Sequence, residues 1–242
     1  MTHDSIGLGE DGPTHQSIET LQMLRVTPNL FTFRPADGKE TSGAYMIAME
    51  HAHTPSVISL SRQACPTLPY TSVEAVAQGG YIYEDLKHAA EGLLYPTLTL
   101  IGTGTELSLA LKTAQAVFEA TKATHAAVWI RIVSMPCTEL FDAQSLDYQK
   151  SVLLPGSPIM SIEASSVEGW RKYAHAPAGI PGTMFGLSAP AEKVYDYFGL
   201  TLEKLIPVAQ NVIAFYTTTT GAQPVAPSLL DYPRFPTPAP LH

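Results

Sequence analysis

The opening residues of the chain carry side chains whose types and spacing suit chemistry. His3, Asp11 and His15 are separated by eight and four positions in a stretch rich in glycine and polar residues. Imidazoles and a carboxylate grouped in this way can orient hydroxyl groups by hydrogen bonding, and an imidazole can exchange a proton near neutral pH. The alternative is a solvated loop in which Asp11 caps the helix that follows. The spacing alone leaves both interpretations open.

Arg62 is a second candidate because it follows a predicted strand at residues 56–61. In an open parallel sheet, ligands bind beyond the carboxyl ends of the strands. The planar guanidinium group can bind a phosphate through two parallel hydrogen bonds. The alternative is a salt bridge between Arg62 and a neighbouring acid.

Two further patterns give weaker signals. His51 and His53 alternate along the chain, as two ligands of a metal would, but no third ligand accompanies them. Residues 102–105, Gly-Thr-Gly-Thr, stand between a predicted strand and a predicted helix, where anion-binding loops occur. They lack both the lysine of a P-loop and the third glycine of a dinucleotide fingerprint, so a tight turn is favoured.

The elements that must position these side chains fall into two series. Over residues 1–62, apolar spacing and turn residues predict a helix at 15–25, a strand at 29–34, a helix at 38–51 and a strand at 56–61. Asp37 with Glu40 three positions later is typical of a helix start. Residues 67–95 are predicted to be a linker with a short strand at 81–83.

From residue 96 a second alternating series begins. It predicts strands at 97–101, 126–133, 159–162 and 183–185, with helices at 104–121, 143–151, 167–175, 191–198 and 202–216. Such alternation with short connections indicates an α/β fold with a doubly wound, mainly parallel sheet. The proline-rich residues 221–242 are predicted to be a tail without a core of its own.

Composition excludes several classes of partner. The chain has 22 acidic and 14 basic residues, and its net charge is -8. The basic residues form no stripe, which argues against nucleic acid or an anionic membrane as the main partner. The two cysteines match no metal spacing and indicate a reducing compartment. With no apolar run of about 18 residues and no signal peptide, a soluble cytoplasmic protein is predicted.

The same motifs resemble the transketolase family, including its dihydroxyacetone synthase branch. The similarity runs in order through residues 2–16, 34–38, 53–55, 60–63, 101–106, 173–175 and 185–191. It implies a truncated pyrimidine-binding domain at 1–66, a linker at 67–95, a transketolase C-terminal domain at 96–220 and a tail at 221–242. The fold class expected is therefore α/β, with a partial first sheet and a complete second one.

The resemblance also implies roles for the candidate residues. His3 and Arg62 match family positions that hold the phosphate of a sugar phosphate substrate. Asp11 and His15 match positions that contact sugar hydroxyls near the reacting carbons, and His15 is the candidate catalytic residue. The reaction implied is transfer of a two-carbon ketol unit between sugar phosphates or to a small aldehyde.

Family members use thiamine diphosphate and Mg²⁺, which supply the carbanion chemistry. The Gly-Asp-Gly motif that binds the metal and diphosphate in the family does not occur in this sequence. The chain is therefore expected to be inactive alone and to need a homodimer partner or a complementing chain with the cofactor domain. Residues 1–62 would need that partner or be the least ordered part. A noncatalytic interaction or remnant protein, and a coding region that extends upstream of Met1, are the alternatives.

Overall fold

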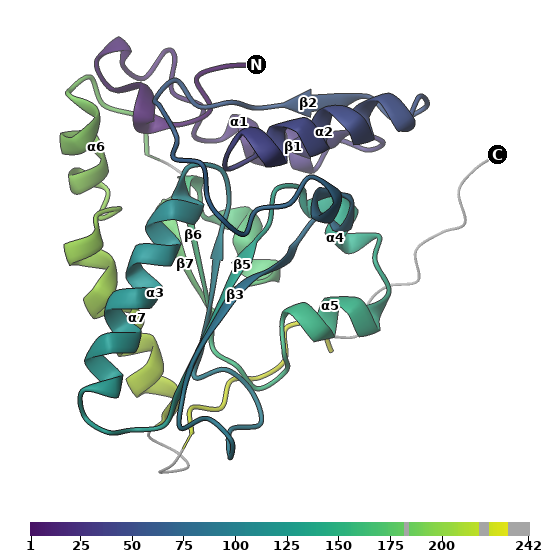
Figure 1. The fold of residues 1–242 in the computed structure, drawn as a ribbon. Coiled ribbons are helices and arrows are strands. Elements are labelled where there is room, and N and C mark those ends of the chain that lie inside the picture. The colour runs from purple at the N-terminus through teal and green to yellow at the C-terminus, as the bar shows by residue number, and fades with distance from the viewer. Residues whose placement is uncertain (182–183, 218–222, 232–242) are drawn as a thin grey trace.

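The computed structural model describes residues 1–181, 184–217 and 223–231, and it contains two sheets (Figure 1). The N-terminal part carries a parallel two-stranded sheet with its helices. Its elements are η1 (Ile6–Asp11), α1 (Thr20–Arg25), β1 (Phe31–Phe33), α2 (Gly38–Glu50), β2 (Ser56–Ile58) and η2 (Glu74–Gln78).

The local sequence explains why α2 forms where it was predicted. Asp37 is the N-cap, and its Oδ1 accepts hydrogen bonds from the amides of Lys39 and Glu40. Glu40 in turn accepts a bond from the amide of Ala36. These contacts satisfy backbone donors that the first turn of a helix leaves unpaired. The apolar face of α2 then packs Ala44 against the small sheet.

The larger sheet has five strands in the order β3-β5-β4-β6-β7, all parallel except β3. The predicted mainly parallel α/β fold is therefore confirmed. Its elements are β3 (Tyr81–His88), β4 (Leu98–Gly102), α3 (Glu106–Lys122), β5 (Val128–Ser134), α4 (Thr138–Asp142), α5 (Leu146–Val152), β6 (Ile159–Ser166), η3 (Glu168–Lys172), β7 (Ala176–Ile180), α6 (Ala191–Tyr197) and α7 (Leu202–Thr217).

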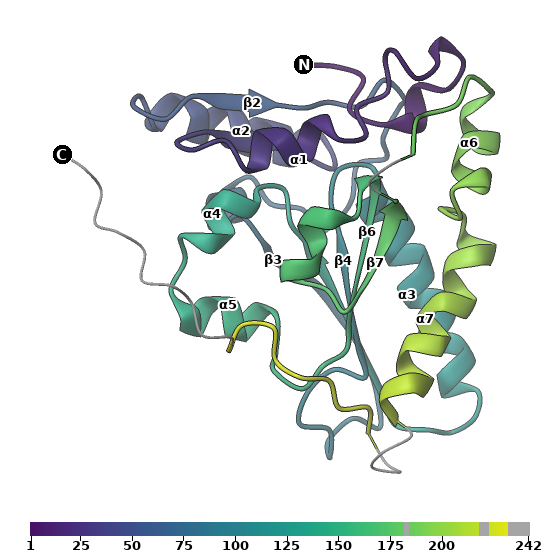
Figure 2. The same ribbon diagram turned by 180° about the vertical axis from the view of Figure 1, so that it is seen from behind.

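Helices cover both faces of this sheet (Figures 1 and 2). One core cluster joins the inner strands to α3, α6 and α7 through residues such as Leu100, Leu107 and Leu205. The other packs Phe141 and Trp170 against the opposite face. Within the described part of the chain, no helix is long and apolar enough to cross a membrane.

Two strands differ from the sequence-based prediction. Residues 67–95 were predicted to be a linker with a short strand at 81–83, but β3 extends to His88 and pairs antiparallel with β5. The final strand is β7, Ala176–Ile180, and not 183–185. Residues 182–183 lie outside the described part, and Met184 and Phe185 adopt no strand.

The N-terminal part lies against the carboxyl edge of the large sheet. The amide of Arg34, just after β1, donates to the carbonyl of Pro136, which follows β5. The carbonyl of Arg34 accepts a bond from the amide of Gly104, which follows β4. The edge at which an open parallel sheet binds ligands is therefore covered here by residues of the same chain.

The described part of the predicted tail packs onto the large domain. Ala226 forms an isolated bridge with Gly156, and Leu230 is buried in the second core cluster. His175 joins this segment to the sheet because its Nδ1 accepts a bond from the amide of Ile159 while its Nε2 bonds the carbonyl of Pro227. An imidazole that accepts at Nδ1 carries its proton at Nε2, so both contacts require the neutral ring. Residues 218–222 and 232–242 of the predicted tail lie outside the described part.

This arrangement predicts a pH-dependent stability. Burial lowers the pKa of His175 below its ordinary value of 6.5, so the unfolded chain takes up a proton before the folded chain does. The contribution of His175 is complete above about pH 6.5 and is lost as the pH falls toward the lowered folded value. We expect the urea midpoint of the wild type to decrease between pH 7.5 and 5.5 more than that of His175→Gln, whose amide can accept and donate in the same places. Equal pH dependence of the two proteins would contradict this role.

Candidate active site

The N-terminal loop brings two of the predicted residues together. The His3 and His15 ring centroids lie 6.4 Å apart, although twelve positions separate the residues in sequence. Each imidazole Nδ1 lies within hydrogen-bond distance of a preceding threonine hydroxyl, Thr2 for His3 and Thr14 for His15. His15 is exposed and His3 is half-buried, so both rings can reach a ligand in solvent.

Arg62 follows β2 at the same end of the small sheet. The amide of Leu60 donates to the carbonyl of Met1, which places the chain leading to Arg62 beside the start of the loop that carries His3. Arg62 is exposed, and no ion pair joins it to any residue in the described ranges. The alternative of a structural salt bridge therefore has no support in this part of the chain.

Asp11 is exposed at the end of η1. The helix predicted at 15–25 begins only at Thr20, and its N-cap, Glu19, makes no side-chain capping bond. The alternative in which Asp11 caps that helix is thus wrong. Its carboxylate faces solvent on the loop between His3 and His15.

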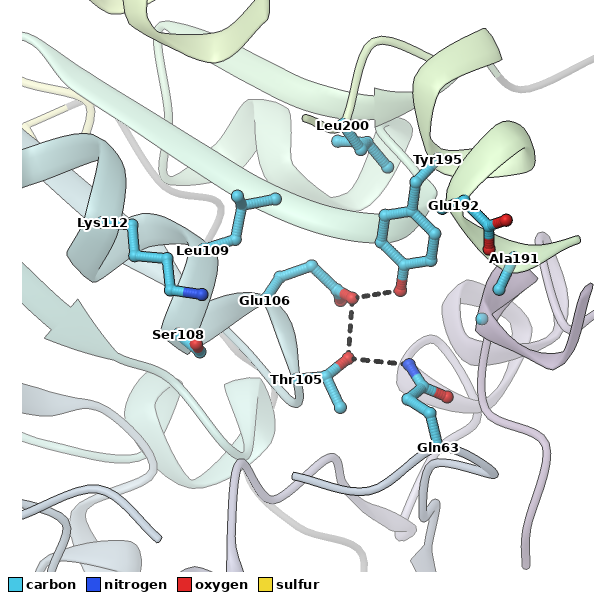
Figure 3. Close-up of a pocket in the computed structure, with 11 residues that line it drawn as sticks. Gln63, Thr105, Glu106, Ser108, Leu109, Lys112, Ala191, Glu192, Tyr195 and Leu200 are labelled. Carbon is cyan, nitrogen blue, oxygen red and sulfur yellow. Dashed lines mark hydrogen bonds between the residues drawn. The ribbon is translucent and has the colours of Figure 1, made fainter. Parts of the chain in front are cut away.

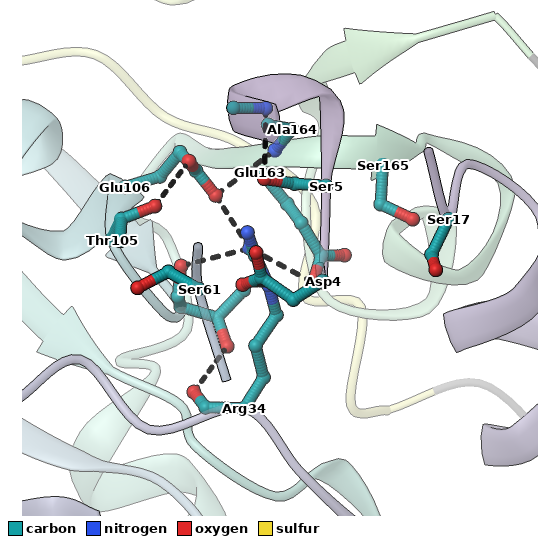
Figure 4. A network of polar contacts seen from close by, with 12 residues as sticks. Asp4, Ser5, Ser17, Arg34, Ser61, Thr105, Glu106, Glu163, Ala164 and Ser165 are labelled. Carbon is teal, nitrogen blue, oxygen red and sulfur yellow. Dashed lines mark hydrogen bonds and ion pairs between the residues drawn. The ribbon is translucent and has the colours of Figure 1, made fainter. Parts of the chain in front are cut away.

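A cluster of buried charges lies next to this loop, and the sequence patterns did not reveal it. Arg34 is fully buried, with Nε 2.9 Å from an oxygen of Asp4 and Nη1 bonded to Glu106 (Figure 4). Nη1 also lies 3.4 Å from Glu163 Oε1. Arg25 at the end of α1 binds both oxygens of Glu163, at 2.7 and 2.8 Å. We call these five residues the buried charge cluster.

The pKa values of two acids in the buried charge cluster, Asp4 and Glu163, shift in opposite directions. Burial raises the pKa of Asp4, and the nearby Arg34 offsets this only in part. Burial would also raise the pKa of Glu163, but Arg25, Arg34 and the indole N–H of Trp170 outweigh it, and the pKa is lowered. Asp4 follows His3 directly and binds Arg34. The buried charge cluster therefore anchors the start of the loop that carries His3.

The Gly-Thr-Gly-Thr turn at residues 102–105 contacts the buried charge cluster. Gly104 has φ 57°, and a Cβ there would lie 2.8 Å from Cζ of Arg34. The turn therefore makes room for a buried guanidinium group, in agreement with the tight-turn interpretation. Nη1 of Arg34 also donates to the carbonyl of Thr103 at 3.1 Å.

A cavity of about 310 Å³ lies between the loop, α3 and α6 (Figure 3). On one wall, Gln63 donates to the hydroxyl of Thr105, and the hydroxyls of Thr105 and Tyr195 both donate to Glu106. The four predicted site residues are not among the described residues that line it.

The described residues offer no metal-binding group. His51 contacts the carbonyl of Ile47 and the ring of Phe31, and no cluster of three or more His, Cys, Asp or Glu side chains suited to a metal occurs in the described ranges.

Comparison with known proteins places these features in a family. Residues 1–67 match the model of the transketolase pyrimidine-binding domain, and residues 79–201 match that of the transketolase-like C-terminal domain. The chain is 48% identical over 217 residues to the chloroplastic transketolase of Solanum tuberosum, a match that covers 88% of this chain and 28% of the potato protein.

Solved structures agree. The chain superposes with a TM-score of 0.81 and 41% identity on transketolase from Pichia stipitis in complex with sedoheptulose 7-phosphate, over 95% of this chain and 31% of that one. A split-gene transketolase described as an inactive β4 tetramer shares the fold, with a TM-score of 0.62 and 22% identity, over 88% of this chain and 65% of that one.

The chain spans about a third of the length of the first two of these relatives. Matches to both domain models in the same order, together with the identity to full transketolases, agree with the two-sheet architecture described above. The chain belongs to the transketolase family.

Proposed function

We propose that this chain supplies the sugar phosphate-binding part of a transketolase-type active site, which transfers a two-carbon ketol unit between sugar phosphates. The proposal is supported by the approach of the His3 and His15 rings, whose centroids are 6.4 Å apart. Arg62 is exposed and has no acidic partner in the described part of the chain. A guanidinium and an imidazole suit a phosphate, and a carboxylate and an imidazole suit sugar hydroxyls.

Each residue then has a distinct role. Arg62 and His3 bind the phosphate, with Arg62 providing a planar pair of donors. Asp11 accepts hydrogen bonds from the sugar hydroxyls. His15 orients a hydroxyl near the reacting carbons, and its imidazole holds or releases a proton there.

The Gly-Asp-Gly motif that holds the metal and diphosphate in the family does not occur in this sequence. Within the described ranges, no group of three or more His, Cys, Asp or Glu side chains suited to a metal occurs either. We therefore propose that a complementing polypeptide carries the cofactor domain and that this chain is inactive without it. The split-gene protein of the same fold motivates a test of that arrangement.

The experiment compares ketol transfer by two samples in thiamine diphosphate and Mg²⁺. One is the purified chain, and the other is the chain mixed with the part of the potato relative that it does not cover. Turnover only in the mixture supports the proposal. Absence of turnover and of cofactor binding in both samples would contradict the proposal and favour a noncatalytic interaction role. A sugar phosphate and a small aldehyde, tried in parallel as acceptors, distinguish the two branches of the family.

Replacement of Arg62 tests the phosphate role. In the active mixture we expect Arg62→Met to raise KM for a phosphorylated acceptor about 10- to 100-fold, the loss typical of a hydrogen-bonded charge. KM for an unphosphorylated acceptor should stay within about 2-fold. Arg171→Met is the control, because Arg171 pairs with Glu168 on the exposed surface of η3 and with no other acid among the residues that the structure describes. An equal effect on both acceptors would exclude phosphate binding by Arg62.

A further inference from the structure

The loop that carries Asp11 and His15 is held in place by the C-terminal domain. The loop itself has little regular structure, because η1 is a 3-10 helix interrupted at Gly9, which has φ 74°. Residues 185–191, which precede and begin α6, lie against it, and α6 and η1 are in contact. In Figure 1 the loop and the start of α6 lie side by side, and the opposite view agrees (Figure 2).

Gln16 makes the most complete of these contacts. It follows His15 directly and is only 6% exposed. Its Nε2 donates to the carbonyl of Gly9 at 3.0 Å and to the carbonyl of Leu187 at 2.9 Å, and its Oε1 accepts a bond from the amide of Leu187 at 3.0 Å. Both donors are used, and reversing the amide would oppose donor to donor and acceptor to acceptor.

A second set of contacts holds the turn around Asp11. The hydroxyl of Ser188 donates to the carbonyl of Glu10 at 2.7 Å. A Cβ on Gly12 would lie 3.2 Å from Cβ of Ser188, and a Cβ on Gly9 would lie 3.0 Å from the amide nitrogen of Ala191. These close approaches fix the backbone on both sides of Asp11.

His15 itself has no comparable support among the described residues. Its ring is exposed, and among the described residues it contacts the hydroxyl of Thr14, at 3.0 Å, and the His3 ring. A shift of the buried Gln16 amide would therefore pass directly to His15 through one peptide unit. A displacement of about 1 Å at a reacting group can cost roughly 100-fold in rate.

We propose that Gln16 is a positioning residue which, with Ser188, lets the C-terminal domain set the place of His15 and Asp11. The inference rests on the proposed function for its catalytic meaning, but the geometry can be tested without activity. Residues 185–191 thereby become part of the active site without touching the substrate.

The first test uses the purified chain. The imidazole Cε1–H resonance of His15, assigned through a His15→Asn variant, is compared in the wild type, Gln16→Glu and Ser188→Ala. Gln16→Glu keeps the shape but cannot donate to the two carbonyls. Gln144→Glu is the matched control, because Gln144 also donates to two carbonyls but lies at the end of α4, away from the loop. We expect the His15 resonance to shift in the two loop variants and to stay unchanged in the control.

The second test uses the active mixture with the complementing polypeptide. For Gln16→Glu we expect kcat to fall about 100-fold with little change in KM for the phosphate-bearing substrate, and for Ser188→Ala roughly 3- to 10-fold. A structural role alone would lower the amount of folded protein without changing kcat per folded enzyme. If Gln16→Glu does not fold, the His15 resonance and the kcat of Ser188→Ala still test the inference. Unchanged His15 resonances in folded variants would overturn the inference, whereas a shift without any turnover in the wild-type mixture would overturn only the proposed function.

Discussion

Replacement of Arg34 by Met is expected to lower the free energy of unfolding by about 3–5 kcal/mol at pH 7, the loss typical of a buried charge cluster deprived of one partner. Arg34 is fully buried and contacts three carboxylates, those of Asp4, Glu106 and Glu163. Glu163 keeps Arg25 in the variant, but Asp4 and Glu106 lose their charged partner. Urea unfolding monitored by circular dichroism measures the loss.

The same variant should regain stability as the pH falls. Burial already raises the pKa of Asp4, and removal of Arg34 raises it further, so the folded variant takes up a proton before the unfolded chain does. The deficit relative to the wild type should thus shrink between pH 7 and pH 5. Arg62→Met is the control: at an exposed arginine without an ion pair in the described part, the change should stay within about 0.5 kcal/mol. A deficit that does not vary with pH would show that lost packing, not charge, is responsible.

Gly79→Ala is expected to be the second large effect, with a loss of roughly 2–4 kcal/mol from backbone strain and overpacking together. Gly79 joins η2 to β3 with φ 74°, and a Cβ there would lie 2.1 Å from the amide nitrogen of Phe141 and 2.4 Å from the carbonyl oxygen of Cys137. Both are backbone atoms at α4, so a side-chain rotation cannot relieve the contact.

Gly199→Ala separates the two causes. Gly199 has nearly the same φ, 77°, but a Cβ there meets no atom within 4 Å. It should cost only the conformational strain, about 1–2 kcal/mol. Thermal or urea unfolding measures the loss in free energy of unfolding for each variant, and the difference between the two losses is the steric contribution at Gly79. If the two losses were equal, the close approach of η2 and α4 would not limit stability.

The elements that the sequence predicted well are those whose signals are local. The start of α2 was predicted from Asp37 and Glu40, and the structure contains that cap. The inner strands β4, β5 and β6 are buried along their whole length, and each begins with apolar or β-branched residues that favour a strand.

The strand that was predicted too short, β3, and the strand that was missed, β7, lie at the edges of the sheet. β3 contains Asp85 and Lys87, and its polar side chains pair across the sheet, as when Asp85 binds Arg131 at 2.9 Å. β7 contains Pro177 and Gly179, residues that weaken any strand prediction. Edge strands tolerate both patterns, and a sequence window does not show which strand will lie at an edge.

In the candidate site as well, the residues with a local signal were predicted, and the residue that acts through a distant contact was not. His3, Asp11, His15 and Arg62 were proposed from residue type and the family resemblance, and their roles remain predictions. Gln16 lies within the motif at residues 2–16, yet nothing in the sequence shows that its partner is Leu187, 171 positions away. Contacts of such separation depend on the packing of two parts of the chain, which local patterns do not contain.

The position of Glu163 has a consequence for how the protein opens. This residue of the large sheet binds Arg25 from α1 and lies beside Arg34 from the small sheet. Separating the two parts would break the ion pairs of Glu163 with both arginines at once. We therefore expect the N-terminal part and the large sheet to lose structure in one transition rather than in two, although separate domain models match them.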